Sequence, residues 1–198
     1  MNPPKSPQDY TWLDRVYQVI GTCFGLGYAP ILPGTCGALV GVAQYLLIVW
    51  LLPTTSKDWP LSGQTLALGL SFLFWTVFTI GLGSWAEEFF GKKDSGIFVT
   101  DEVVGTLLTL LLFRVPEHPY LTLLWAFPLT RIIDIVKIPP AKRLEKLPAG
   151  WGVVADDLLG SLYTAALLYL LLYLEISQSF PIQQRWSWNS KLGRRLCL

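Results

Sequence analysis

The chain has 198 residues, of which 15% are charged and 52% are hydrophobic. An ordinary soluble domain carries about 25% charged residues, so part of this apolar surface is expected to face lipid. The 15 Lys+Arg and 14 Asp+Glu leave a net charge of +1, which gives no long-range field for nucleic acid. The composition therefore disfavours a soluble enzyme and excludes nucleic acid as a main partner.

Apolar runs of membrane length are the strongest elements in the sequence. The strongest candidate is residues 63–83, which has 21 positions and no charge; residues 36–53 also carry no charge, and residues 158–174 are a third, shorter candidate. Runs of about 20 apolar residues span a bilayer as helices, and none of these shows the apolar/polar alternation of a strand. We expect an all-α, polytopic membrane bundle with about three full spans.

A less regular pair of apolar segments lies between the second and third runs. Residues 103–113 and 120–130 are each too short to span comfortably, and the two prolines in the sequence between them indicate a turn. We expect a short helical hairpin, either crossing the membrane with Arg114 and His118 snorkelling at its tip or packing against the other helices. Such a hairpin places the loops before and after it on one membrane face.

Those two loops, residues 84–102 and 131–157, hold most of the central charges, and each ends in an acidic pair before an apolar helix. The pairs are Asp101 with Glu102 and Asp156 with Asp157. Their convergence, with Asp134 nearby, would supply the oxygen ligands that Mg²⁺ prefers. The alternative is that each pair only stabilises a helix N-terminus, where the macrodipole favours carboxylates.

Two basic residues accompany Asp134 at the start of the second loop. Arg131, Asp134 and Lys137 are spaced i, i+3, i+6, on one face of a helical turn. They form either a solvated ladder of ion pairs or a phosphate clamp, in which the planar guanidinium offers two parallel hydrogen bonds.

A glycine- and proline-rich segment, residues 21–41, precedes the first apolar helix. It places the Thr35 hydroxyl and free backbone N–H groups at a helix start, an arrangement that binds oxyanions. The alternative is a Thr N-cap after a glycine-rich turn. No phosphate-binding P-loop or dinucleotide fingerprint is present.

Three sequence blocks together resemble the phosphatidylglycerophosphatase A family of magnesium-dependent membrane phosphatases. The blocks are GLGYAPILPGTCGALVG at residues 25–41, DSGIFVTDEVVGTLLTL at 94–110 and RIIDIVKIPPAKRLEKLPAGWGVVADDLLGSLYT at 131–164. They occur in the family's order at similar spacing and cover most of the chain between residues 25 and 164. The resemblance implies hydrolysis of phosphatidylglycerophosphate to phosphatidylglycerol and inorganic phosphate, in phospholipid biosynthesis.

The resemblance also implies roles for these residues. Mg²⁺ is the expected cofactor, and the expected location is the bacterial inner membrane, with the active site facing the cytoplasm. Direct attack by water and an aspartyl-phosphate intermediate are both compatible with the sequence. The expected catalytic and metal-binding residues are Asp101, Glu102, Asp134, Asp156 and Asp157, and the expected phosphate-binding residues are Arg131, Lys137 and Thr35.

Other chemistries fit less well. The single histidine, His118, falls in the hairpin turn, and the three cysteines form neither a C-x₅-R loop nor a C-x-x-C pair, so they are expected to be reduced and structural. A small membrane transporter or a non-catalytic membrane interaction protein is the alternative function. We expect residues 1–174 to form one membrane domain, followed by a polar, partly basic tail at 175–198.

Overall fold

The computed structural model describes residues 10–52, 63–92, 95–115, 118–136, 139, 144 and 150–179, with side chains to residue 174 in the last segment. By its internal contacts the chain divides into two compact units, Met1–Ala165 and Ala166–Leu198. The first unit holds the elements discussed below, and the described part of the second is the C-terminal portion of one helix.

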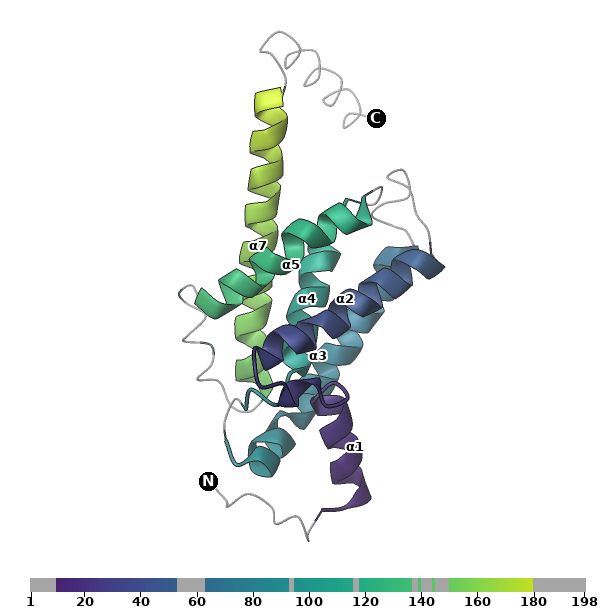
Figure 1. Cartoon of the computed structure of the whole chain (residues 1–198), viewed down its shortest axis with the longest axis vertical. Helices are drawn as coiled ribbons and strands as arrows, with labels where there is room; N and C mark the ends of the chain where they lie inside the picture. The colour runs from purple at the N-terminus through teal and green to yellow at the C-terminus, as the bar shows by residue number, and fades with distance from the viewer. Residues whose placement is uncertain are drawn as a thin grey trace. The chain divides into compact units, whose positions relative to one another are not determined.

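Every regular element in the described residues is helical, as the sequence predicted, and four helices are long and apolar enough to cross a membrane. The four are α2, α3, α5 and α7, and a short helix, α4, lies among them in the first unit (Figure 1). The bounds are α1 Trp12–Gly21, a 3-10 turn Leu26–Tyr28, α2 Pro33–Leu51, α3 Gly63–Phe90, α4 Thr100–Leu112, α5 Pro119–Val136 and α7 Gly150–Ser179.

Helix α4 is the buried centre of the first unit. It has 13 residues and nine of them are buried, and it packs against α2, α3 and α5. At 1.5 Å per residue it is roughly 20 Å long, too short for the ~30 Å hydrocarbon core. Its neighbours therefore shield it from lipid, as the hairpin prediction allowed.

Small residues let α2 approach α4 closely. A methyl group added at Gly37 would lie 2.7 Å from Val99 Cβ, and one at Gly41 would lie 3.0 Å from Thr106 Cβ. Helices in lipid gain little from the hydrophobic effect and associate through such close backbone packing. The same side of α2 begins at Gly34, which meets Glu102.

Hydroxyl groups tie α4 to the surrounding helices. Thr79 Oγ1 on α3 donates to Thr100 Oγ1 at 2.9 Å, and Thr130 Oγ1 on α5 lies 3.3 Å from Thr109 Oγ1. Ser161 Oγ on α7 donates to the Gly105 carbonyl at 2.8 Å. These bonds satisfy polar groups where no water competes and fix the rotation of α4 about its axis.

The second half of the hairpin is longer than the sequence predicted. The expected segment 120–130 is part of α5, which has 18 residues, continues to Val136 and contains Pro128. The sequence placed Arg131 and Asp134 on a separate helical turn at the start of the second loop, and in the structure that turn continues α5. Of the two alternatives for the hairpin, the structure favours packing over snorkelling for Arg114, which is buried and donates to Thr65 on α3, whereas His118 is exposed.

The described part of the second unit is the continuation of α7 beyond Ala165, with exposed leucines and tyrosines that include Leu170 and Tyr173. The candidate span in this helix runs over Gly150–Leu174. The predicted polar tail lies outside the residues with described side chains, and its separation from residues 1–174 stays a prediction.

Candidate functional site

Three carboxylates from three helices meet at one end of the first unit. Glu102 on α4, Asp134 on α5 and Asp157 on α7 each offer an oxygen atom, and these oxygens all lie within 4.8 Å of one another. The sequence predicted that the two acidic pairs would converge if the hairpin returned to the same face. One member of each pair does so, together with Asp134.

Local structure explains how each carboxylate reaches this point. Glu102 lies in the first turn of α4, Asp134 in the last turn of α5, and Asp157 two turns into α7, which begins at Gly150. The sequence placed Asp156 and Asp157 at the end of a loop, and the structure corrects this, because α7 starts earlier. They therefore do not cap that helix.

The first acidic pair does not supply the N-cap of α4, but it lies in the first turn, where the helix-stabilising alternative places it. The N-cap of α4 is Val99, whose side chain makes no capping hydrogen bond, and Asp101 and Glu102 follow within the first turn. The macrodipole of α4 still favours negative charge there. Glu102 nevertheless points to the other helices, where a cation can relieve the repulsion between the carboxylates.

Arg131 is the positive partner within this cluster. Its guanidinium forms an ion pair with Glu102, donating through both Nη1 and Nη2, and Nη2 lies 3.0 Å from Asp134 Oδ2. The side chain is mostly buried, and its Nε has no hydrogen-bond partner among the described residues. One guanidinium thus links a carboxylate of α4 to one of its own helix, α5.

The charges of the cluster are not balanced by this single cation. The four other carboxylates that the sequence singled out all repel the charge on Asp157. Asp157 Oδ2 is buried and has no hydrogen-bond partner among the described residues. Burial and the nearby carboxylates of Asp134 and Asp156 raise the pKa of Glu102, while Arg131 lowers it. Such a site is stabilised by a further cation.

The donor set fits a hard divalent cation. Three carboxylate oxygens lie within 4.8 Å of one another, and carboxylate oxygens are the ligand type that Mg²⁺ takes. One of the three residues is Asp157, whose buried Oδ2 has no hydrogen-bond partner among the described residues. Asp101 and Asp156 are also buried, each beside a member of the cluster in sequence. They fall outside the group of three, and their roles stay predictions.

The N-terminus of α2 meets the same cluster. A methyl group at Gly34 would overlap the Glu102 carboxylate and lie 3.1 Å from Arg131 Nη2. Pro33 is the first residue of α2 and Leu32 is the N-cap, so Thr35 is the third helical residue and is not the N-cap. The backbone N–H groups of the first turn therefore lie beside the ion pair, at the positive end of the helix dipole.

The remaining predicted phosphate ligand, Lys137, lies outside the described residues. It follows directly on Val136, the last residue of α5. Sequence reasoning missed Gly34, whose lack of a side chain allows α2 to reach Glu102. Its signal was the spacing of Gly34, Gly37 and Gly41, which marks one face of α2.

Thiol chemistry is disfavoured. Cys23 is fully buried, and burial, with a smaller effect of Asp101, raises the pKa of its thiol to about 12. A thiol with that pKa is not a nucleophile near neutral pH. Neither Cys23 nor Cys36 forms a disulfide.

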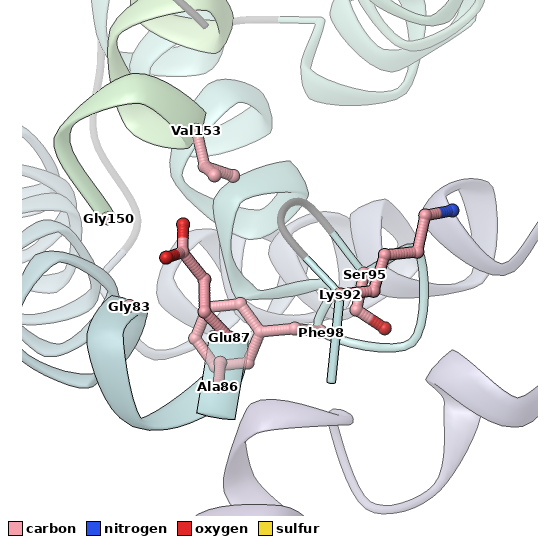
Figure 2. A pocket seen from close by; sticks show the side chains of 8 residues that line it. All are labelled: Gly83, Ala86, Glu87, Lys92, Ser95, Phe98, Gly150 and Val153. Atoms are coloured by element: carbon pink, nitrogen blue, oxygen red, sulfur yellow. The ribbon is translucent and has the colours of Figure 1, made fainter. Parts of the chain in front are cut away.

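A separate small hollow lies where the end of α3 meets the start of α7. Figure 2 shows the Glu87 carboxylate directed toward Gly150 and Val153, and Lys92 leading away from it. Glu87 Oε1 is buried and has no hydrogen-bond partner among the described residues. Among its lining residues this hollow has one carboxylate, so it can be compared with the cluster of three carboxylates.

The fold and the site together define a class of protein: a polytopic helical membrane protein with a carboxylate cluster at the end of its bundle. Residues 19–172 match the family model of phosphatidylglycerophosphatase A, which is more than half of the chain. The chain belongs to the phosphatidylglycerophosphatase A family.

Curated relatives cover most of the chain. A protein of Bacteroides thetaiotaomicron named "Putative phosphatidylinositol-3-phosphatase" is 36% identical over 76% of this chain and 89% of its own length. Phosphatidylglycerophosphatase A of Escherichia coli is 26% identical over 80% of this chain and 85% of its own length, and that of Haemophilus influenzae is 29% identical over 76% and 85%. No solved structure matches the chain significantly.

Proposed function

We propose that this protein hydrolyses the phosphomonoester of phosphatidylglycerophosphate, giving phosphatidylglycerol and inorganic phosphate in phospholipid synthesis. The observation that carries the proposal is the cluster of Glu102, Asp134 and Asp157 at the end of a bundle of membrane-length helices. Such a position suits a lipid headgroup, whose acyl chains stay among the apolar helices. Family membership and the two relatives named phosphatidylglycerophosphatase A support the same reaction.

We propose Mg²⁺ as the cofactor, held by Glu102, Asp134 and Asp157, with Asp101 and Asp156 as further candidate ligands. Bound there, Mg²⁺ would neutralise phosphate charge and lower the pKa of a bound water. A carboxylate not engaged with the cation, Asp101 or Asp156, can orient the attacking water and accept its proton, or protonate the leaving alkoxide.

Arg131 and the start of α2 are suited to bind the phosphate. The Arg131 Nε is a buried donor with no partner among the described residues, next to two donors already used by Glu102 and Asp134. Gly34 meets the same pair, and the backbone N–H groups of the first turn of α2 and the Thr35 hydroxyl that follows Gly34 are further candidate donors. Lys137 is the further candidate, one residue beyond α5.

One relative suggests a second candidate substrate. The relative from Bacteroides thetaiotaomicron, 36% identical, is named for a phosphoinositide rather than for phosphatidylglycerophosphate. Both are phosphomonoesters carried on a membrane lipid, and the same carboxylates would serve either. The difference lies in the group between the two phosphates, a glycerol or an inositol ring.

The test is phosphate release by the purified protein in detergent, from phosphatidylglycerophosphate and from phosphatidylinositol 3-phosphate, each with Mg²⁺ and then with EDTA. We expect release from phosphatidylglycerophosphate that stops with EDTA. Release only from the phosphoinositide would change the substrate but keep the reaction. Folded protein that releases phosphate from neither lipid would make the transporter or interaction function the better one.

We further propose that the protein resides in the bacterial inner membrane with the cluster facing the cytoplasm, where the family's substrate is made. Labelling in intact cells and in broken cells tests the side. A cysteine replacing Glu88, which is exposed at the end of α3, should react with a membrane-impermeant reagent only after the cells are broken.

A further inference from the structure

Helix α1, which precedes the first span, is amphipathic, but its apolar side faces outward and its polar side faces the protein. Its polar residue Asp14 is 4% exposed and faces the protein, while the apolar Trp12 is 72% exposed. Leu13, Val16 and Val19 are exposed with it, and at 100° per residue these positions share one side of the helix. In water such an arrangement would be unfavourable, because apolar area would be hydrated while a carboxylate is buried.

The buried side of α1 is fixed to α3 by specific contacts. The Trp85 indole Nε1 donates to Asp14 Oδ1 at 2.7 Å, and Asp14 also completes a capping box with Thr11. The ring of Tyr17 meets that of Trp85 edge to face, with centroids 5.5 Å apart. The outward direction of the apolar side is therefore set by the protein and does not arise from a loosely attached helix.

The outer surface of α1 continues the lipid-facing surface of α3. On α3 the exposed large apolar residues run from Leu66 to Val77, and after Val77 none of the large apolar residues of this helix is exposed. The part that follows is the part that α1 covers. The apolar surface thus passes from α3 onto α1, which indicates that both contact the same solvent.

The turn after α1 extends this surface. Phe24 is 78% exposed and has a φ of 59°, between Cys23 and Gly25, which also have positive φ. A bulky residue in this strained backbone region usually has a functional reason. The described exposed apolar residues of the turn and of the approach to α2 are Phe24, Leu26, Tyr28, Ile31 and Leu32.

We propose that α1 and the turn that follows it, residues 12–32, form a membrane-surface element whose apolar side lies in the lipid at the headgroup level. The partner is the bilayer itself. Arg15 is exposed at the edge of the apolar side, and it is the one exposed charge between residues 10 and 32, which suits an anionic lipid surface. Trp12 and Tyr28 are the residue types that prefer this depth.

This element is hydrogen-bonded to the start of α4, the helix that carries Glu102 of the carboxylate cluster. The Val99 N–H, at the N-cap of α4, donates to the Gly21 carbonyl at the end of α1 at 3.0 Å. The turn ends at Leu32, the N-cap of α2, two residues before Gly34 meets Glu102. The depth of residues 12–32 in the membrane therefore sets the depth of the site. This consequence rests on the proposed function, whereas the membrane contact does not.

The direct test measures depth in full-length protein reconstituted in nanodiscs of phosphatidylcholine and phosphatidylglycerol. With Cys36 and Cys197 replaced by serine, a nitroxide is placed at Val16→Cys, and separately at Phe74→Cys as the lipid reference and Glu88→Cys as the aqueous reference. We expect the label at 16 to collide with oxygen in preference to a water-soluble nickel chelate, as at 74.

Two results would overturn the proposal. Collision mainly with the nickel chelate, as at Glu88→Cys, would place α1 in water. Protection from both reagents, with spin–spin broadening between labels, would mean that a second copy of the chain covers this side.

The link to the site is tested by activity. Val16→Glu should lower phosphate release from lipid in vesicles by about tenfold, with less than about twofold change on the same lipid in detergent micelles, and Val16→Leu should match the wild type in both. An equal loss in vesicles and micelles would refute the coupling. A wild-type protein that hydrolyses no lipid would refute the proposed function and leave the depth result standing.

Discussion

The carboxylate cluster and the hollow around Glu87 both place acidic groups among helices of the first unit, but they differ in composition. The cluster brings Glu102, Asp134 and Asp157 within 4.8 Å, with Arg131 bonded to two of them. The hollow contains Glu87 as its one carboxylate, with Lys92 directed away. Carboxylates that repel one another cost free energy that a bound cation would reduce, so the cluster is the candidate cation site and the single carboxylate is not.

The largest expected effect is that of Asp157→Asn. The change keeps the shape of a side chain whose Oδ2 has no partner among the described residues, and it removes one charge from the cluster. Phosphate release should fall by about a thousandfold, and binding of Mn²⁺, followed by electron paramagnetic resonance, should weaken. Near-normal activity with normal Mn²⁺ binding would mean that the cluster is not the cation site.

Arg131→Lys comes second. Lysine keeps the charge but cannot bond Glu102 and Asp134 at once through a planar fork. Phosphate release should fall by about a hundredfold, the upper range for groups that orient ligands, while the protein stays folded. The same loss at every substrate concentration would locate the defect in turnover, and full activity would show that the fork is dispensable.

Gly34→Ala tests the close approach of α2 to the cluster. The added methyl group would overlap the Glu102 carboxylate and must displace it or the helix. A displacement of about an ångström at one carboxylate is expected to lower phosphate release by at least about tenfold. Gly69→Ala on α3 is the matched control, because a methyl group there meets no atom within 4 Å. Equal activity of the two variants would contradict the contact.

Glu87→Gln has the smallest expected effect. It neutralises the carboxylate of the hollow without changing its size, and phosphate release should stay within about twofold of the wild type. A loss comparable to that of Asp157→Asn would show that the two acidic regions act together.

Several elements of the fold could be predicted from the sequence. The apolar runs gave the spans in α2, α3 and α7, because burial in lipid requires about 20 apolar residues whatever surrounds them. The hairpin correctly placed Glu102 and Asp157 on one face. The continuity of α5 was missed: the sequence divided an apolar segment, 120–130, from a charged helical turn starting at Arg131, whereas the buried ion pair of Arg131 allows one helix to hold both.

The site was predicted only in part, because contacts between helices are not encoded in local sequence patterns. Residue type and spacing identified all five carboxylates and Arg131, but not which of them meet. The group of three and the pairing of Arg131 with Glu102 depend on the rotation of α4, which is set by contacts such as Ser161 with Gly105. No local pattern encodes the rotation of a helix about its axis.

The sequence by itself indicated a membrane protein, because the chain is poor in charge and rich in apolar runs, and it supplied the hypothesis of a phosphate and cation site from grouped carboxylates with an arginine. The tertiary structure decided which side chains face one another and which face outward. It brought Gly34 against Glu102 and turned the apolar side of α1 away from the protein. Both outcomes come from packing between residues distant in the chain, where the free energy depends on shape and not on composition.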